Sequence, residues 1–169
     1  MNQLTSTTNR GFMKTQYIIT AALGILLGVV GQANAGEKEL SKNQVPKAVI
    51  DAFEKAHPDA KGVKYEEELF AGKTAYEVEY KKNGKELEFS YSADGTLLQK
   101  EEEIDVKALP TPVVQAIMKA HPKATIEEAE KVMKPDGTVT GYEAEIKVAG
   151  KEIKLELDVS GNILKTKHK

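Results

Sequence analysis

Residues 76–91 read YEVEYKKNGKELEFSY, and this stretch decides the expected fold. Apolar and charged residues alternate on both sides of Asn83-Gly84, a pair typical of a two-residue β-hairpin turn. Such a turn places each apolar residue of the first strand opposite an apolar residue of the second. The expected pairs are Tyr80 with Leu87, Val78 with Phe89, and Tyr76 with Tyr91. The turn and the alternation therefore predict the same antiparallel hairpin, with one apolar face.

A helix is expected before this hairpin. Pro46 suits the first turn of a helix, where its missing N–H would have no partner in any case. Val49, Ile50 and Phe53 then share one face at helical spacing. His57-Pro58 ends the helix, because the residue before a proline is disfavoured in the α region.

Two further strands complete the first half of the chain. One is expected over residues 63–69, turning at Ala71-Gly72, and the other over residues 96–102, entered through Asp94-Gly95. The helix should pack on the apolar face of the resulting four-stranded antiparallel meander.

The same pattern returns in the second half. The residues that recur 64 positions later are Pro46, Ala52, Ala56, His57, Pro58 and Ala60, and those that recur 66 positions later are Tyr76, Gly84 and Gly95. The predicted fold class is therefore α+β, with two repeated units over residues 36–104 and 105–169, each one helix packed on a four-stranded antiparallel sheet. The residues expected to be buried are Phe53, Tyr76, Val78, Phe89, Ile117, Ile146 and Leu155.

This order of elements resembles the PepSY-like family, which is β-lactamase-inhibitor-like, in two tandem copies. The motifs behind the resemblance are the proline-led helix, the His-Pro-x-Ala at residues 57–60 and 121–124, and the strands at Tyr76 and Tyr142. The resemblance implies a small exported, non-catalytic domain whose open sheet face binds another protein.

Residues 1–35 are predicted to be a secretory signal peptide, with translation starting at Met1 or Met13. A short cationic region leads into the uncharged apolar run of residues 17–30, and Ala33-Asn34-Ala35 supplies the small-residue cleavage pattern. Cleavage there removes Arg10 and Lys14 and no acid, so the formal charge changes from −2 to −4. We expect an acidic periplasmic or secreted protein that binds no nucleic acid and, after cleavage, no membrane.

The composition excludes several kinds of chemistry. With no cysteine, the chain has no thiol nucleophile, no Fe–S cluster and no thiolate ligand for zinc. No serine lies in a Gly-x-Ser-x-Gly elbow, and no glycine-rich phosphate loop precedes a helix. We therefore expect neither an enzyme nor a cofactor.

The two helix-ending histidines have two interpretations. His57 and His121 could form a ligand pair or sense pH, or they could cap the negative ends of the two helices. Their recurrence at equivalent helix ends favours capping.

The sheet face away from the helix is the candidate binding surface. In the first half it should carry a dense set of acids, with Glu79 opposite Glu88. In the second half the equivalent pair is Glu145 with Lys154, which attract each other. This face could be merely a solvated surface, or it could bind a ligand. The predicted partner-binding residues are Glu77, Glu79, Glu86 and Glu88, with Phe70 as an exposed aromatic anchor at the rim.

These observations predict a non-catalytic, inhibitor-like binding module that holds a protein or peptide partner of the cell envelope on its acidic sheet face. The alternative is a protein that binds or buffers a cation such as Ca²⁺ with the same glutamates.

Overall fold

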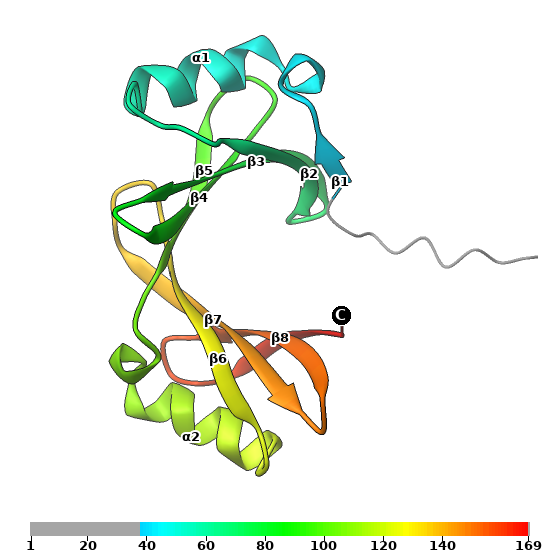
Figure 1. Cartoon of the computed structure of the whole chain (residues 1–169), viewed down its shortest axis with the longest axis vertical. Helices are drawn as coiled ribbons and strands as arrows, with labels where there is room; N and C mark the ends of the chain where they lie inside the picture. The colour runs from blue at the N-terminus through cyan, green and yellow to red at the C-terminus, as the bar shows by residue number, and fades with distance from the viewer. Residues whose placement is uncertain (1–37, 169) are drawn as a thin grey trace, which may run out of the picture. The chain divides into compact units, whose positions relative to one another are not determined.

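The computed structural model describes residues 38–168, which fold into one antiparallel sheet with two short helices (Figure 1). The strands are paired in their sequence order. They are β1 (Lys38–Leu40), β2 (Lys64–Phe70), β3 (Lys73–Lys82), β4 (Lys85–Tyr91), β5 (Leu97–Glu103), β6 (Thr125–Met133), β7 (Val139–Val148), β8 (Lys151–Asp158) and β9 (Ile163–His168). The helices are α1 (Lys47–Ala56) and α2 (Thr111–Ala120), each preceded by a single 3₁₀ turn, Lys42–Gln44 and Val106–Ala108.

The predicted fold class is wrong in two respects. The sheet does not divide into two four-stranded units, because β5 pairs with β6 from Lys100–Met133 to Glu103–Glu130 and joins the halves into one nine-stranded sheet within residues 38–168. The structure is also mostly sheet rather than a balanced α+β arrangement. The physical reason is that an unpaired edge strand exposes backbone N–H and C=O groups, and β5 and β6 satisfy each other's edges. The short strand β1 pairs with β2 in the same way.

The register predicted for the central hairpin is confirmed. Tyr80 pairs with Leu87, Val78 with Phe89, Tyr76 with Tyr91, and Glu79 with Glu88. Asn83 and Gly84 both have positive φ, 56° and 83°, as a two-residue turn of this type requires. The predicted pairing of Glu145 with Lys154 is confirmed too.

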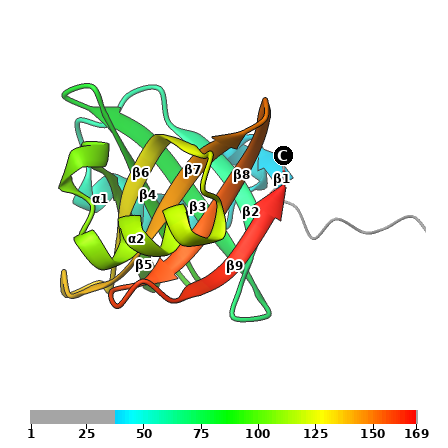
Figure 2. The same ribbon diagram turned by 90° about the horizontal axis from the view of Figure 1, so that it is seen from below.

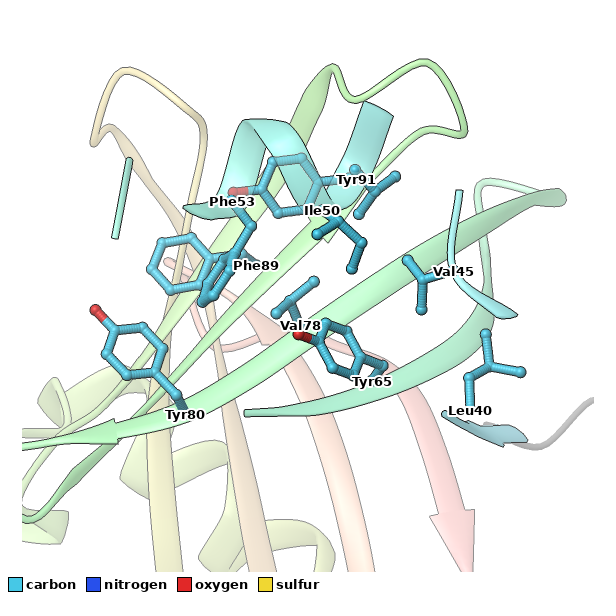
Figure 3. Packing of buried hydrophobic residues seen from close by; sticks show 10 residues of the cluster. Leu40, Val45, Ile50, Phe53, Tyr65, Val78, Tyr80, Phe89 and Tyr91 are labelled. Carbon is cyan, nitrogen blue, oxygen red and sulfur yellow. The ribbon is translucent and has the colours of Figure 1, made fainter. Parts of the chain in front are cut away.

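Two hydrophobic clusters lie between the sheet and its helices. Beneath α1, the rings of Phe53, Tyr80 and Phe89 are packed with centroids 5.6–6.1 Å apart (Figure 3). Beneath α2, which lies over β6–β8 in Figure 2, the cluster is aliphatic and includes Ile117 and Leu155. Of the residues predicted to be buried, all are buried except Tyr76, which is half-buried at the edge of its cluster.

Equivalent glycines place the two helices on the sheet. Gly95 lies in the turn before β5 with φ +82°, and a Cβ added there would lie 2.5 Å from the carbonyl oxygen of Ala48 in α1. Gly161, in the turn before β9, has φ +87°, and its added Cβ would lie 2.5 Å from the carbonyl oxygen of Pro112 in α2. Only glycine permits both this φ and this close approach.

The predicted signal peptide, residues 1–35, lies outside the described residues. Between residues 38 and 168, no helix combines the length and the hydropathy that crossing a membrane demands.

Candidate functional site

Six consecutive strands each contribute one charged side chain to a single cluster on the sheet face opposite the helices. Side chains alternate along a strand, so the register assigns each residue to one face. Glu88 pairs with Glu101, and Glu130 pairs with Glu143, on the face away from Val78 and Ala144. We call the following residues the glutamate cluster: Glu77 of β3, Glu88 of β4, Glu101 of β5, Glu130 of β6 and Glu143 of β7, with Lys154 of β8.

The carboxylates of the cluster are close together and largely removed from water. Glu88, Glu101, Glu130 and Glu143 are all buried, with only 5% of Glu101 exposed. Their oxygens form two triads, and within each triad one oxygen from every residue lies within 4.8 Å of the others. The first triad is Glu77, Glu88 and Glu101, and the second is Glu101, Glu130 and Glu143.

Lys154 compensates the second triad. Its Nζ lies 2.6 Å from Oε2 of Glu143 and 3.7 Å from Oε2 of Glu130. Burial alone would lower the pKa of Lys154, but the charges of Glu143 and Glu130 outweigh burial and raise it. The ammonium therefore stays charged inside the cluster.

Within the described part of the chain, Glu88 and Glu101 have no comparable ion pair, although the charge of Lys154 opposes part of the rise in the pKa of each. Among the ion pairs formed by residues 38–168, none involves Glu88 or Glu101. Burial, followed by the charge of Glu77, raises the pKa of Glu88 to about 10. Burial, followed by the charge of Glu143, raises the pKa of Glu101 well above its ordinary value. At neutral pH these two carboxyls are held in the protonated form unless a cation joins them.

One oxygen of Glu101 has no donor. Oε1 accepts a hydrogen bond from Nε2 of Gln99 at 2.8 Å, whereas the buried Oε2 has no hydrogen-bond partner among residues 38–168. A buried polar atom without a partner is costly, so a donor or a metal ion placed at this oxygen would be stabilising.

The cluster opens into a cavity of about 450 Å³. Glu77, Glu101, Glu143 and Lys154 line it from one side, and the β2–β3 turn around Leu69–Gly72 lines it from another. Glu156 of β8 and Lys165 and Lys167 of β9 complete the wall, so the sheet curls enough to bring both of its ends to one cavity, and glutamates outnumber lysines along its lining. Leu69 at the turn is 55% exposed, which makes it an apolar contact at the rim.

The structure separates the predicted site residues into two sets. Glu77 and Phe70 line the cavity, and Glu88 lies buried in the cluster. Glu79 instead pairs with Lys64 at 2.7 Å, and Glu86 pairs with Lys81 at 2.8 Å. The opposition of Glu79 and Glu88 is thus relieved within the molecule.

The expected exposure of Phe70 needs correction, because the ring is half-buried and the neighbouring Leu69 is the exposed side chain. The reason is that Leu69 and Phe70, as neighbours in a strand, lie on opposite faces of the sheet.

Sequence reasoning missed four members of the glutamate cluster as site residues, namely Glu101, Glu130, Glu143 and Lys154. The alternation of Gln99, Glu101 and Glu103 along β5 was a usable signal for an acidic face. Only the pairing of β5 with β6, however, brings Glu101 beside the second half of the sheet.

His57 and His121 are the C-cap residues of α1 and α2, and each cap is a hydrogen bond of the backbone N–H and not of the imidazole. The N–H of His57 donates to the carbonyl of Phe53, and the N–H of His121 donates to that of Ile117, both at 2.8 Å. The His57 ring lies against Phe89, with its Nδ1 3.1 Å from the hydroxyl of Tyr80.

Family profiles match this chain over two overlapping segments. The profile described as "Putative beta-lactamase-inhibitor-like, PepSY-like" matches residues 74–165. The profile described as "Peptidase propeptide and YPEB domain" matches residues 46–93. A search of curated proteins finds no match.

Solved structures share the fold at low sequence identity. A BLIP-like protein from Bacteroides fragilis is 23% identical, with a TM-score of 0.50 over 73% of this chain and 86% of that one. A protein from Bacteroides eggerthii, described as one of the "putative periplasmic proteins", is 15% identical, with a TM-score of 0.57 over 73% and 88%. A DUF2874 family protein from Bacteroides uniformis is 16% identical, with a TM-score of 0.56 over 73% and 89%.

Proposed function

Because the chain belongs to the PepSY-like, beta-lactamase-inhibitor-like family, we propose that it is an exported, non-catalytic binding module that holds a positively charged segment of a protein partner in its acidic cavity. The observation that carries this proposal is the buried Oε2 of Glu101, which lacks a donor among residues 38–168 and lies on a residue lining the cavity. The family descriptions, inhibitor-like and propeptide, are those of binding modules rather than enzymes.

Export to the periplasm is part of the same proposal. It is supported by the predicted signal peptide over residues 1–35 and by the structural neighbour from B. eggerthii described as periplasmic. The two tandem copies and the boundaries at residues 35 and 104 stay predictions from the sequence.

A lysine or arginine side chain is the group that fits the cavity. Its N–H donors would satisfy the buried Oε2 of Glu101, and charge-assisted hydrogen bonds are strongest where water is excluded. The half-buried Phe70, which lines the cavity, would add apolar contact beside that charge. Glu79 and Glu86, which have lysine partners of their own, would contribute mainly to the long-range field.

The test is affinity capture from the envelope fraction of the exporting cell with three forms of the protein. The wild type and the control Asp59→Asn, which alters an exposed acid outside the cavity, should capture the same partner. Glu101→Gln should lose that partner, and added salt should weaken its capture by the wild type. Equal capture by Glu101→Gln and wild type would contradict the proposal.

Binding of a divalent cation such as Ca²⁺ is the second candidate function. It is favoured by the two carboxylate triads, whose oxygens are close enough to share an ion. A ligand that binds only the native state raises the melting temperature, so a thermal melt with and without Ca²⁺ tests this candidate independently of any protein partner.

A further inference from the structure

The two triads of the glutamate cluster are alike in composition and differ in their ion pairs with Lys154. Each has three carboxylates with one oxygen apiece inside 4.8 Å, and they share Glu101. Lys154 contacts both other members of the second triad, Glu130 and Glu143. Neither Glu88 nor Glu101 has an ion pair to a basic residue within residues 38–168.

The orphan oxygen lies where the two triads meet. Glu101 is 95% buried, and its Oε2 is one of two buried side-chain oxygens without a hydrogen-bond partner in the described part of the chain. The other, Oε2 of Glu143, lies 2.6 Å from the ammonium of Lys154, so only Oε2 of Glu101 has no cation beside it among the described ion pairs. Glu88 pairs directly with Glu101 across the strands, and Glu77 lies diagonally beside Glu88, opposite Ser90. This arrangement directs three carboxylates from three adjacent strands at one point.

We propose that Glu77, Glu88 and Glu101 bind one hard divalent cation of the size of Ca²⁺, and that Lys154 fills the corresponding role for Glu130 and Glu143. This assignment rests on the second candidate function and gives that function a defined site.

The donor set favours calcium. All three ligands are carboxylates, which suit Ca²⁺ and Mg²⁺ rather than the softer metals that histidine or cysteine would select. Oxygens on opposite sides of Ca²⁺ are separated by about 4.6–5.2 Å, and those around Mg²⁺ by about 4.0–4.2 Å. Oxygens that all lie within 4.8 Å of one another are close enough to share one ion of either kind. Calcium is favoured because Mg²⁺ demands near-ideal octahedral geometry and loses its waters reluctantly, whereas Ca²⁺ accepts irregular sets of carboxylate oxygens. The cavity beside Glu77 and Glu101 has room for the waters that complete the coordination.

The experiment is isothermal titration of the purified protein with CaCl₂, and in parallel with MgCl₂. The informative pair of variants is Glu88→Gln, which alters only the first triad, and Glu130→Gln, which alters only the second. Calcium should bind the wild type with one ion per chain, and magnesium should bind about tenfold more weakly. Glu88→Gln should weaken calcium binding about tenfold or more, whereas Glu130→Gln should stay within about threefold of the wild type.

Two more variants keep the test decisive. Glu77→Gln, at a half-buried position, should reproduce the loss if Glu88→Gln does not fold. Lys154→Met should add a second calcium equivalent, because Glu130 and Glu143 would then lack their ammonium.

The outcomes separate this site from the functions it rests on. Equal weakening by Glu88→Gln and Glu130→Gln would overturn the assignment and leave cation binding in place. Absence of calcium binding to the wild type at millimolar concentration would overturn both the site and the second candidate function. The first proposed function would stand or fall separately, by the capture of a protein partner.

Discussion

Glu88 and Lys154 occupy equivalent positions in the two halves of the sheet, 66 residues apart, and carry opposite charges. Each stands opposite a glutamate, Glu79 for Glu88 and Glu145 for Lys154. The pKa of Glu88 is raised to about 10, chiefly by burial, so that side chain is neutral at physiological pH. Lys154 keeps its charge because Glu143 and Glu130 surround it. One exchange of acid for base thus decides whether a buried row of carboxylates is compensated internally or depends on protons or an external cation.

Lys154→Met should have the largest effect on this comparison. Removing the ammonium leaves Glu130 and Glu143 buried without their cation, which should lower the free energy of unfolding at pH 8 by about 3–5 kcal/mol. Urea denaturation at pH 8 measures this loss of free energy. Lys147→Met is the matched control, because that ammonium pairs with Glu127 at 3.3 Å on the exposed surface and should cost less than about 1 kcal/mol. Similar losses for both variants would show that Lys154 does not compensate the cluster.

The next largest effect should come from the glycines that place the helices on the sheet. In Gly161→Ala, the alanine must adopt a left-handed backbone conformation and its Cβ clashes with the Pro112 carbonyl. This change should lower the free energy of unfolding by about 2–4 kcal/mol. Gly95→Ala should behave alike beneath α1, since the geometry is the same. Gly137→Ala is the control, with φ +88° and open space around the added Cβ, and should cost only about 1–2 kcal/mol. If Gly161→Ala matches this control, the close approach of α2 is not limiting.

Stability should fall as the pH rises. The folded-state pKa of Glu88, about 10, exceeds its unfolded value near 4.5, so the folded state binds more protons throughout that window. Between pH 6.5 and pH 8, the contribution of Glu88 should lower the free energy of unfolding by about 2 kcal/mol. His57 does not obscure this slope, because its ordinary pKa lies at the lower end of the range and burial lowers its folded pKa further. Glu88→Gln should flatten the slope measured by urea denaturation, and an unchanged slope would show that Glu88 is ionised.

Glu79→Gln should have the smallest effect. Its partner Lys64 is largely exposed, so loss of the pair should change the free energy of unfolding by less than about 1 kcal/mol. The association rate with a captured partner should fall modestly, and its salt dependence should flatten. The reason is that Glu79 adds to the long-range electrostatic attraction but does not contact the partner. A loss of several kcal/mol would mean that the pair is structural.

The sequence predicts what is local in this fold. The Asn83-Gly84 turn and the alternation around it determine the register of β3 and β4, and with it the acidic face, because turn chemistry and pattern act over a few residues. The helix ends at His57 and His121 follow from the prolines behind them.

The join between β5 and β6 could not be predicted in the same way. Each strand has an alternating pattern that is complete by itself, and nothing in it specifies which other edge it meets. The prediction of two units therefore failed at this point. The same join carries Glu101 to Glu130, so the candidate site was predicted for Glu77 and Glu88 and missed for its central residue.

The measurement that tests the central claim most directly is the calcium dependence of unfolding for Glu88→Lys at pH 8. This change gives the first half of the sheet the ammonium that Lys154 supplies to the second, beside the unpartnered Oε2 of Glu101. The account predicts that Glu88→Lys without calcium is at least as stable to urea as the wild type, and that added calcium no longer stabilises it. A variant that is less stable than the wild type and still gains stability from calcium would contradict the account.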